Sequence, residues 1–219
     1  MKQNKISQFI LSLFFPSFCV GCNTEGSFLC SSCAQTCVIQ RAPVAHTGTS
    51  AIAFTYAATE YREQPIVQKL ITTLKYRGAK DAARHCADLI ISHLKLARFT
   101  PPHDCIMTAV PLHQKRFRER GFNQADCIAR VIGTAFPIPY DPRLLLRTIH
   151  TPQQTHLQER KKRLENMRNA FLCIDKNRVY GKTVIIVDDV TTTGATLEAC
   201  AQACKDAGAR RVMAFVVAK

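Results

Sequence analysis

The chain has 219 residues, which is enough for one sizeable α/β domain with a small appendage. Its formal net charge is +14, and such an excess favours an anionic partner: nucleic acid, a phosphorylated small molecule or an anionic membrane surface. A basic surface that serves only solubility is the alternative. No apolar run approaches the roughly 18 residues that a membrane-spanning helix needs.

The first residues carry an apolar stripe at helical spacing, made of Ile6, Phe9, Ile10, Leu13 and Phe14. Two lysines precede the stripe, as in a secretion signal. The apolar core is short, however, and no small-residue cleavage site follows it. We expect a short amphipathic helix packed on the protein, with a helix lying on a membrane surface as the alternative.

Four of the eleven cysteines are spaced as a metal site. Cys19, Cys22, Cys30 and Cys33 form two C-x2-C pairs separated by seven residues, and four thiolates in this pattern are typical of structural zinc. A redox-active pair is the rival interpretation. Cys37 is expected outside the site, and the remaining cysteines are expected to be buried thiols. The odd number and the lack of a signal peptide favour a reducing cytoplasm.

Apolar periodicity predicts strands alternating with helices along the rest of the chain. The expected strands are 51–57, 105–110, part of 138–150, 182–187 and 211–217. The expected helices are 60–74, 80–96, 122–136, 151–171 and 194–207. Residues 111–121 are expected as a basic loop. This order predicts a parallel sheet covered on both faces, so we divide the chain into a cysteine module (1–37), a linker (38–50) and an α/β domain (51–219).

The stretch VIIVDDVTTTGAT, residues 184–196, places two carboxylates where a buried strand passes into a helix. Backbone amides of the turn and the start of the helix can hold a phosphate. Carboxylates repel phosphate but accept hydrogen bonds from vicinal hydroxyls, so the aspartates suit a ribose, with Mg²⁺ as a possible aid. A ribose 5-phosphate presents both groups. The predicted binding residues are Asp188, Asp189, Thr191, Thr192, Thr193, Gly194, Ala195 and Thr196.

This stretch resembles the 5-phosphoribosyl-1-pyrophosphate (PRPP) motif of type I phosphoribosyltransferases, although Thr191 stands where an aliphatic residue is more usual. The segments LKYRGAKDAA, VPLHQKRFRERGFNQA and RTIHTPQQTHLQERKKRLENMRNAF, in this order behind a four-cysteine module, resemble the ComF family of competence-associated proteins. The resemblance implies a type I phosphoribosyltransferase-like fold: a central parallel sheet flanked by helices, with a small hood and an N-terminal zinc-binding module. It also implies a link to DNA uptake in natural transformation.

Basic residues gather in three segments. Lys115, Arg116, Arg118 and Arg120 stand where the resemblance places a pyrophosphate loop, and they are also candidates for tracking the phosphates of nucleic acid, with Phe117 and Phe122 available for base stacking. Weaker nucleic-acid candidates are Lys75, Arg77, Arg160, Lys161, Lys162, Arg163 and Arg168, of which the last five lie in the expected hood. Since no sequence-reading motif is present, any contact should be with single strands and salt-dependent.

Three functions remain open from the sequence. The first is a competence protein that handles incoming single-stranded DNA and keeps a PRPP pocket. The second is a Mg²⁺-dependent phosphoribosyltransferase acting on an unidentified nucleobase or amine. The third is an adaptor whose zinc module docks a DNA-translocating helicase. The expected location is the cytoplasm, with contact at the inner face of the membrane as an alternative.

Overall fold

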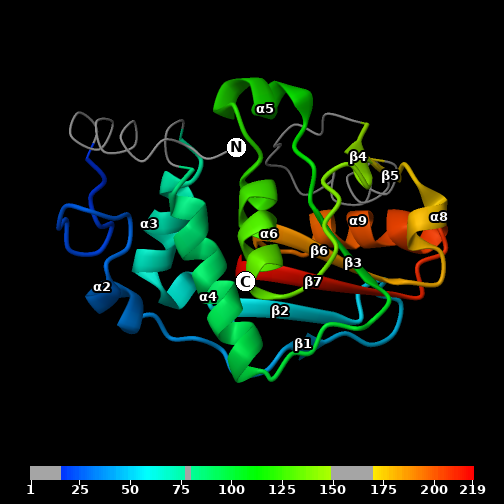
Figure 1. The fold of residues 1–219 in the computed structure, drawn as a ribbon, viewed down its shortest axis with the longest axis horizontal. Coiled ribbons are helices and arrows are strands. Elements are labelled where there is room, and N and C mark those ends of the chain that lie inside the picture. The colour runs from blue at the N-terminus through cyan, green and yellow to red at the C-terminus, as the bar shows by residue number, and fades with distance from the viewer. Residues whose placement is uncertain (1–15, 77–79, 149–169) are drawn as a thin grey trace, which may run out of the picture.

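The computed structural model describes residues 16–76, 80–148 and 170–219. Its centre is a five-stranded sheet in the order β1-β2-β7-β6-β3 (Figure 1). The strands are β1 (Val44–Ala45), β2 (Phe54–Thr59), β3 (Cys105–Ala109), β6 (Thr183–Val190) and β7 (Arg211–Ala218). All neighbouring strands are parallel except β1, which pairs antiparallel with β2. The predicted α/β fold is confirmed.

Helices cover both faces of the sheet. The side chains of β6 and β7 accordingly alternate between two buried clusters, one on each face. Ile185, Val187 and Phe215 belong to one buried cluster, whereas Val184 and Ile186 belong to another. Successive side chains of a strand point to opposite faces, so two covered faces require a continuous apolar run. Cluster one includes residues of α3 (Pro65–Thr73), α4 (Ala82–Leu96) and α6 (Gln124–Ala135), and cluster two includes residues of α9 (Ala195–Asp206).

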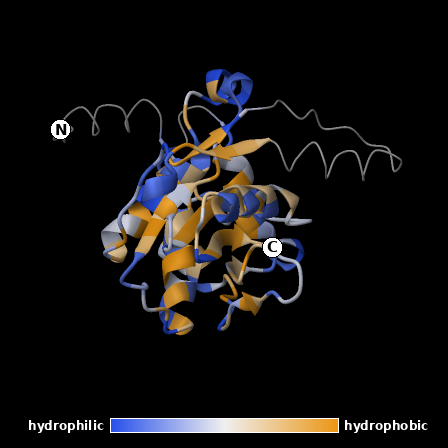
Figure 2. Cartoon of the chain, turned by 90° about the vertical axis from the view of Figure 1, so that its right-hand side faces the viewer, coloured by the Kyte–Doolittle hydropathy of each residue, from blue (hydrophilic) through white to orange (hydrophobic). Residues whose placement is uncertain are grey.

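The remaining elements are short. They are α2 (Ser31–Gln35), η1 (Tyr61–Glu63), α5 (Gln114–Arg120), α8 (Lys176–Val179) and an antiparallel pair, β4 (Leu145–Arg147) with β5 (Phe171–Cys173). Figure 1 shows α5 at the top of the molecule and the β4–β5 pair beside α9. In Figure 2 the sheet is largely apolar, whereas α5 is largely hydrophilic.

Two local predictions were wrong. Residues 111–121 are not a loop throughout, because α5 forms within them: the His113 side chain accepts a hydrogen bond from the N–H of Lys115, and Gly121 ends the helix with φ 78°. The expected linker contains β1, and the backbone N–H of Gln40 donates to the carbonyl of Ala58 at 2.8 Å. This segment is therefore bound to the domain.

Boundaries of other elements shifted by a few residues. β6 extends to Val190, so both aspartates of the motif belong to the strand, and β2 begins at Phe54. The expected helices at 1–15 and in most of 151–171 lie outside the described residues, while Phe171 begins β5. None of the described helices is long and apolar enough to cross a membrane.

Candidate functional site

Asp188 and Asp189 lie at the carboxyl end of β6, between the neighbouring strands β3 and β7. The backbone N–H of Asp189 donates to Asp188 Oδ1 at 2.9 Å, and the N–H of Val190 donates to Asp189 Oδ1 at 2.7 Å. These bonds fix one oxygen of each carboxylate. The carboxyl edge of an open α/β sheet is where such folds bind ligands.

The turn after β6 leads directly into the N-terminus of α9. Thr191 is buried and its N–H donates to the carbonyl of Ala218 at 3.0 Å, so it closes the end of the sheet. Thr192 and Thr193 are exposed. Gly194 adopts φ 75°, which glycine tolerates without strain, while Ala195 and Thr196 begin the helix half-buried. The turn therefore presents hydroxyls and a helix N-terminus beside the two carboxylates.

Charges around the two aspartates perturb one another. Burial and the charge of Asp189 raise the pKa of Asp188 well above its usual value, and Arg147 opposes the rise. Burial lowers the pKa of Arg147 and of Arg120, with Arg116 adding to both effects. Asp188 counteracts the shift at Arg147, and Asp189 counteracts the shift at Arg120. Arg147 of β4 and Arg120 of α5 therefore lie near enough to the strand end for their charges to act on its carboxylates, and Arg116 acts on both arginines.

The side chains of α5 differ in exposure. Lys115 and Arg118 are exposed, whereas Arg116 and Arg120 are half-buried. Phe117 is exposed, but Phe122 is buried beneath Lys80, whose Nζ lies 5.6 Å from the ring centroid. The expectation that Phe122 is available for base stacking was wrong, because this ring belongs to the core.

Of the weaker nucleic-acid candidates, only Lys75 lies in the described part of the chain, where it is half-buried next to the exposed Tyr76. The others lie outside the described residues: Arg77, Arg160, Lys161, Lys162, Arg163 and Arg168.

The four predicted metal ligands come together. The Sγ atoms of Cys19, Cys22, Cys30 and Cys33 all lie within 4.8 Å of one another, and Cys22 Sγ lies 3.6 Å from Cys30 Sγ. Four sulfurs at about 2.3 Å from one zinc ion are about 3.8 Å apart, so the cluster fits a tetrahedral S4 site. Cys37 is outside it and donates to the carbonyl of Cys33.

Backbone N–H groups favour thiolates in this cluster. Burial raises the pKa of Cys19, but hydrogen bonds from the backbone of Cys30, Cys22 and Gly21 outweigh it and lower the pKa to about 6. A side-chain hydrogen bond with Cys30 and burial raise the pKa of Cys33 to about 12. Four sulfurs so close together cannot all ionise without a cation between them, which is the role a metal would fill.

Comparison with known proteins identifies the family of this chain. It is 29% identical over 161 residues to "Competence protein F" of Haemophilus influenzae, which covers 73% of this chain and 64% of that protein. It is 32% identical over 159 residues to "DNA utilization protein YhgH" of Escherichia coli O157:H7, which covers 71% of this chain and 68% of that protein. The chain belongs to the ComF family.

A family model of the phosphoribosyl transferase domain matches residues 147–219 of this ComF-family chain. The match includes both aspartates and the turn, and it begins at Arg147, but it does not include α5 or the cluster of Cys19, Cys22, Cys30 and Cys33. Among solved structures, the chain resembles a glutamine PRPP amidotransferase from B. subtilis with a TM-score of 0.42 and 17% identity, covering 63% of this chain and 26% of that one.

Sequence reasoning missed two residues of the site. The charge of Arg147 acts on Asp188, and no local pattern in the sequence indicates that interaction. Glu198, in the first turn of α9, accepts hydrogen bonds from Ser50 Oγ at 2.9 Å and from the N–H of Ala51 at 2.5 Å. An acidic residue in the first turn of a helix was the available signal, although its partners precede it by nearly 150 residues.

Proposed function

We propose that this ComF-family protein acts in DNA uptake by holding single-stranded DNA on the basic residues of α5 and the neighbouring segments. We further propose that it binds a ribose phosphate such as PRPP at the carboxyl end of β6. The observation that carries the proposal is the charge interaction of Arg147 with Asp188 and of Arg120 with Asp189, while Arg116 acts on both arginines. The names of its relatives, competence protein F and DNA utilization protein, support the DNA partner.

The two ligands would use different groups of this edge. Cations of α5 match phosphates of either ligand, whereas carboxylates match free sugar hydroxyls. A nucleotide inside a DNA strand has no free 2′ or 3′ hydroxyl, so its sugar offers the aspartates no hydrogen bond to accept. PRPP has both hydroxyls, and Mg²⁺ would join its pyrophosphate to the carboxylate edge.

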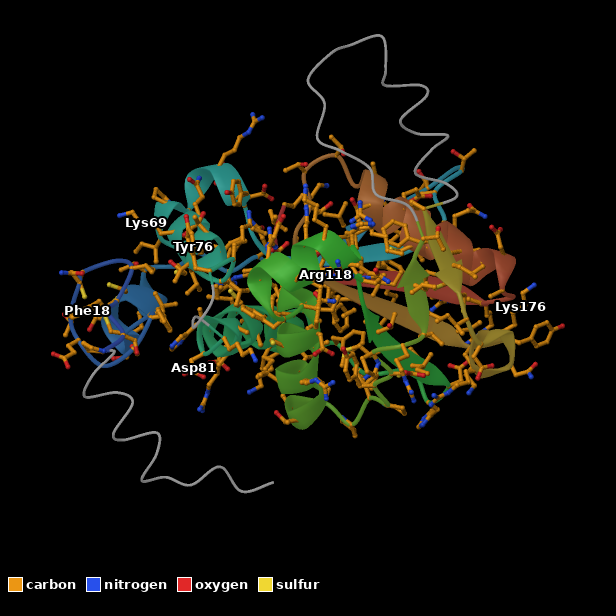
Figure 3. The ribbon with its side chains drawn as sticks, turned by 90° about the horizontal axis from the view of Figure 1, so that it is seen from above. Phe18, Lys69, Tyr76, Asp81, Arg118 and Lys176 are labelled. Carbon is orange, nitrogen blue, oxygen red and sulfur yellow. The ribbon has the colours of Figure 1, made fainter. Side chains whose placement is uncertain are left out.

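A salt titration tests the DNA surface. The full-length protein is titrated with 5′-fluorescein-dT20 between 50 and 200 mM NaCl, and binding is followed by fluorescence anisotropy. Replacing Lys115, Arg116 and Arg118 by alanine should reduce the slope of log K against log salt by about 0.7 for each lost phosphate contact. The control replaces three exposed cations elsewhere, Lys95, Arg143 and Lys176, with the same change in net charge. Figure 3 shows Lys176 well apart from Arg118.

The ribose-phosphate site is tested with Asp189→Asn. This variant should weaken PRPP binding in the presence of Mg²⁺, measured by calorimetry, and leave the affinity for dT20 unchanged. Equal salt slopes for the two triple variants would refute the DNA surface, and unchanged PRPP binding would refute the role of the carboxylate.

A working phosphoribosyltransferase is the second candidate, favoured by the match of residues 147–219 to the phosphoribosyl transferase domain. Its chemistry would replace pyrophosphate at C1 of PRPP, with arginines of α5 stabilising the leaving group. Release of pyrophosphate in the presence of common nucleobases tests it, and absence of release with every base would remove its support.

We also propose that the cysteine cluster holds structural Zn²⁺, since its four sulfurs have the right spacing. All four ligands come from the protein, so no position remains for a substrate. Leu29 directly precedes Cys30, and Cys37 follows Cys33 by four residues. Both belong to the same hydrophobic core as Leu70 of α3. The metal would therefore stabilise this side of the domain, and one bound zinc per chain by elemental analysis is the expected result. Docking of a helicase by this module stays a prediction.

A further inference from the structure

Four aromatic side chains are strongly exposed among the described residues: Phe18 (44%), Tyr76 (66%), Phe117 (50%) and Tyr180 (76%). Single exposed aromatic rings are common on protein surfaces, so exposure alone does not indicate a function. Their positions differ, however. Two of them lie beside cations at the carboxyl edge of the sheet, where the arginines of the candidate site converge.

Phe117 lies in the middle of α5, between Arg116 and Arg118 in the sequence. Because α5 follows β3, it starts at the same edge of the sheet as the end of β6. The charge of Asp189 acts on Arg120 of the same helix, which is consistent with that placement. An exposed ring at this position is surrounded by groups that attract phosphates.

Tyr76 follows α3 and lies next to Lys75, just before α4. The start of α4 belongs to the same edge, since Lys80 lies over the ring of Phe122 immediately after α5. Burial raises the pKa of Cys86 in the second turn of α4, and the charge of Asp189 adds to that rise. In the view of Figure 3, Tyr76 lies between Arg118 of α5 and Phe18, which is farther from α5.

We propose that Tyr76 and Phe117 form a stacking platform for the bases of single-stranded DNA, with the cations of α5 and Lys75 holding its phosphates. The proposal rests on the proposed function. Every base has a π-face, so stacking on aromatic rings binds a strand without reading its sequence. This matches a protein that must accept incoming DNA of any sequence, and it gives the strand a path from the end of α3 across α5.

Alanine substitutions separate stacking from charge. Tyr76→Ala and Phe117→Ala should each weaken dT20 binding about 5- to 150-fold, while the salt slope stays that of the unmodified protein, because no phosphate contact is lost. Tyr180→Ala is the matched control. Tyr180 is the most exposed of the four rings, and Lys182 stands two positions after it, but it lies before β6, at the opposite edge of the sheet. Its loss should leave dT20 affinity unchanged.

A second measurement does not depend on affinity. The chain contains no tryptophan, so Phe117→Trp, Tyr76→Trp and Tyr180→Trp each introduce a single tryptophan, whose emission is read apart from that of the tyrosines. Stacking of a base on the indole should quench the first two on addition of dT20, and the third should keep its intensity. These substitutions retain an aromatic ring, so they should also retain affinity.

The outcomes separate the two proposals. If the unmodified protein fails to bind dT20, the proposed function falls and this inference falls with it. If the protein binds dT20 but the alanine variants keep full affinity and the tryptophans at 76 and 117 are not quenched, the stacking platform is refuted and the DNA surface of α5 stands.

Discussion

A side chain at Gly21, inside the first C-x2-C pair, is expected to weaken metal binding. A Cβ atom added at this position would lie 2.6 Å from Cys33 Sγ and 3.3 Å from Ile66 Cδ1. Ordinary contact begins at 3.4 Å, so an alanine side chain would press a ligand sulfur by about 0.8 Å while Ile66 of α3 limits its retreat. Overpacking of this kind costs about 1–3 kcal/mol.

Most of that cost should fall on the metal-bound form, since the displaced atom is a ligand. Gly21→Ala should then lower zinc affinity by about 5- to 150-fold, measured by competition with a chromophoric chelator at pH 7. Gly133→Ala makes the same chemical change in the interior of α6, where the nearest atom would be Met107 Cε at 3.6 Å. This control should keep full zinc affinity and gain about 0.4–1 kcal/mol of stability towards urea.

The reasoning would be refuted by Gly21→Ala binding zinc as tightly as the parent. It would equally be refuted by Gly133→Ala losing zinc affinity to the same extent, since the effect would then have nothing to do with the contact at Cys33.

Three further predictions concern stability, each measured by urea unfolding. Glu198→Ala should lose about 2–3 kcal/mol because the N–H of Ala51 is left without its charged acceptor, and Glu198→Gln should lose less. Burial and Asp189 raise the pKa of Asp188, so the folded state favours its protonated form and parent stability falls as pH rises from about 4 through the raised pKa. Asp188→Asn should therefore be more stable than the parent at pH 8, by on the order of 1 kcal/mol, and should lose that advantage at pH 4. Burial lowers the pKa of His93, whose Nδ1 lies 2.6 Å from the carbonyl of Gln40, so parent stability should fall as pH drops below about 6.5, and His93→Gln should flatten the fall.

Each of these has a contrary result. Equal loss in Glu198→Ala and Glu198→Gln would mean that the carboxylate contributes nothing beyond its volume. An advantage of Asp188→Asn that is the same at both pH values would show that the charge of Asp188 is not the cause. If the stability of His93→Gln falls at low pH as much as that of the parent, groups other than His93 cause the acid sensitivity.

Features that depend on neighbouring residues were predictable from the sequence. The four cysteines lie within fifteen positions, so their spacing alone brings the sulfurs together. The apolar runs of β6 and β7 predicted buried strands because both sheet faces are covered. In contrast, α5 was missed because six of its seven residues are polar or charged, so it has no apolar periodicity. The capping residues His113 and Gly121 were the available signal.

Contacts set by topology were not predictable in the same way. Arg147 and Asp188 are forty-one positions apart, and their proximity depends on the pairing of β4 with β5 beside α9. The binding of residues 38–50 to the domain depends on β1 and on backbone bonds to β2, which no composition of that segment reveals. Hydrophobic periodicity predicts a helix or a strand, but which distant residues it contacts follows only from the order of strands in the complete sheet.

The arginines lie near both proposed anion sites, so the two proposed ligands should affect each other's binding. Arg116 influences both Arg120 and Arg147, so an anion bound near α5 relieves repulsion among the three. A ribose phosphate at the end of β6 and a DNA phosphate on α5 would each reduce the repulsion among these arginines. The ligand that binds second would therefore gain less binding free energy from this effect. Competition between PRPP and dT20 should therefore be partial and weaken as salt rises, whereas two ligands occupying one pocket would exclude each other at every salt concentration.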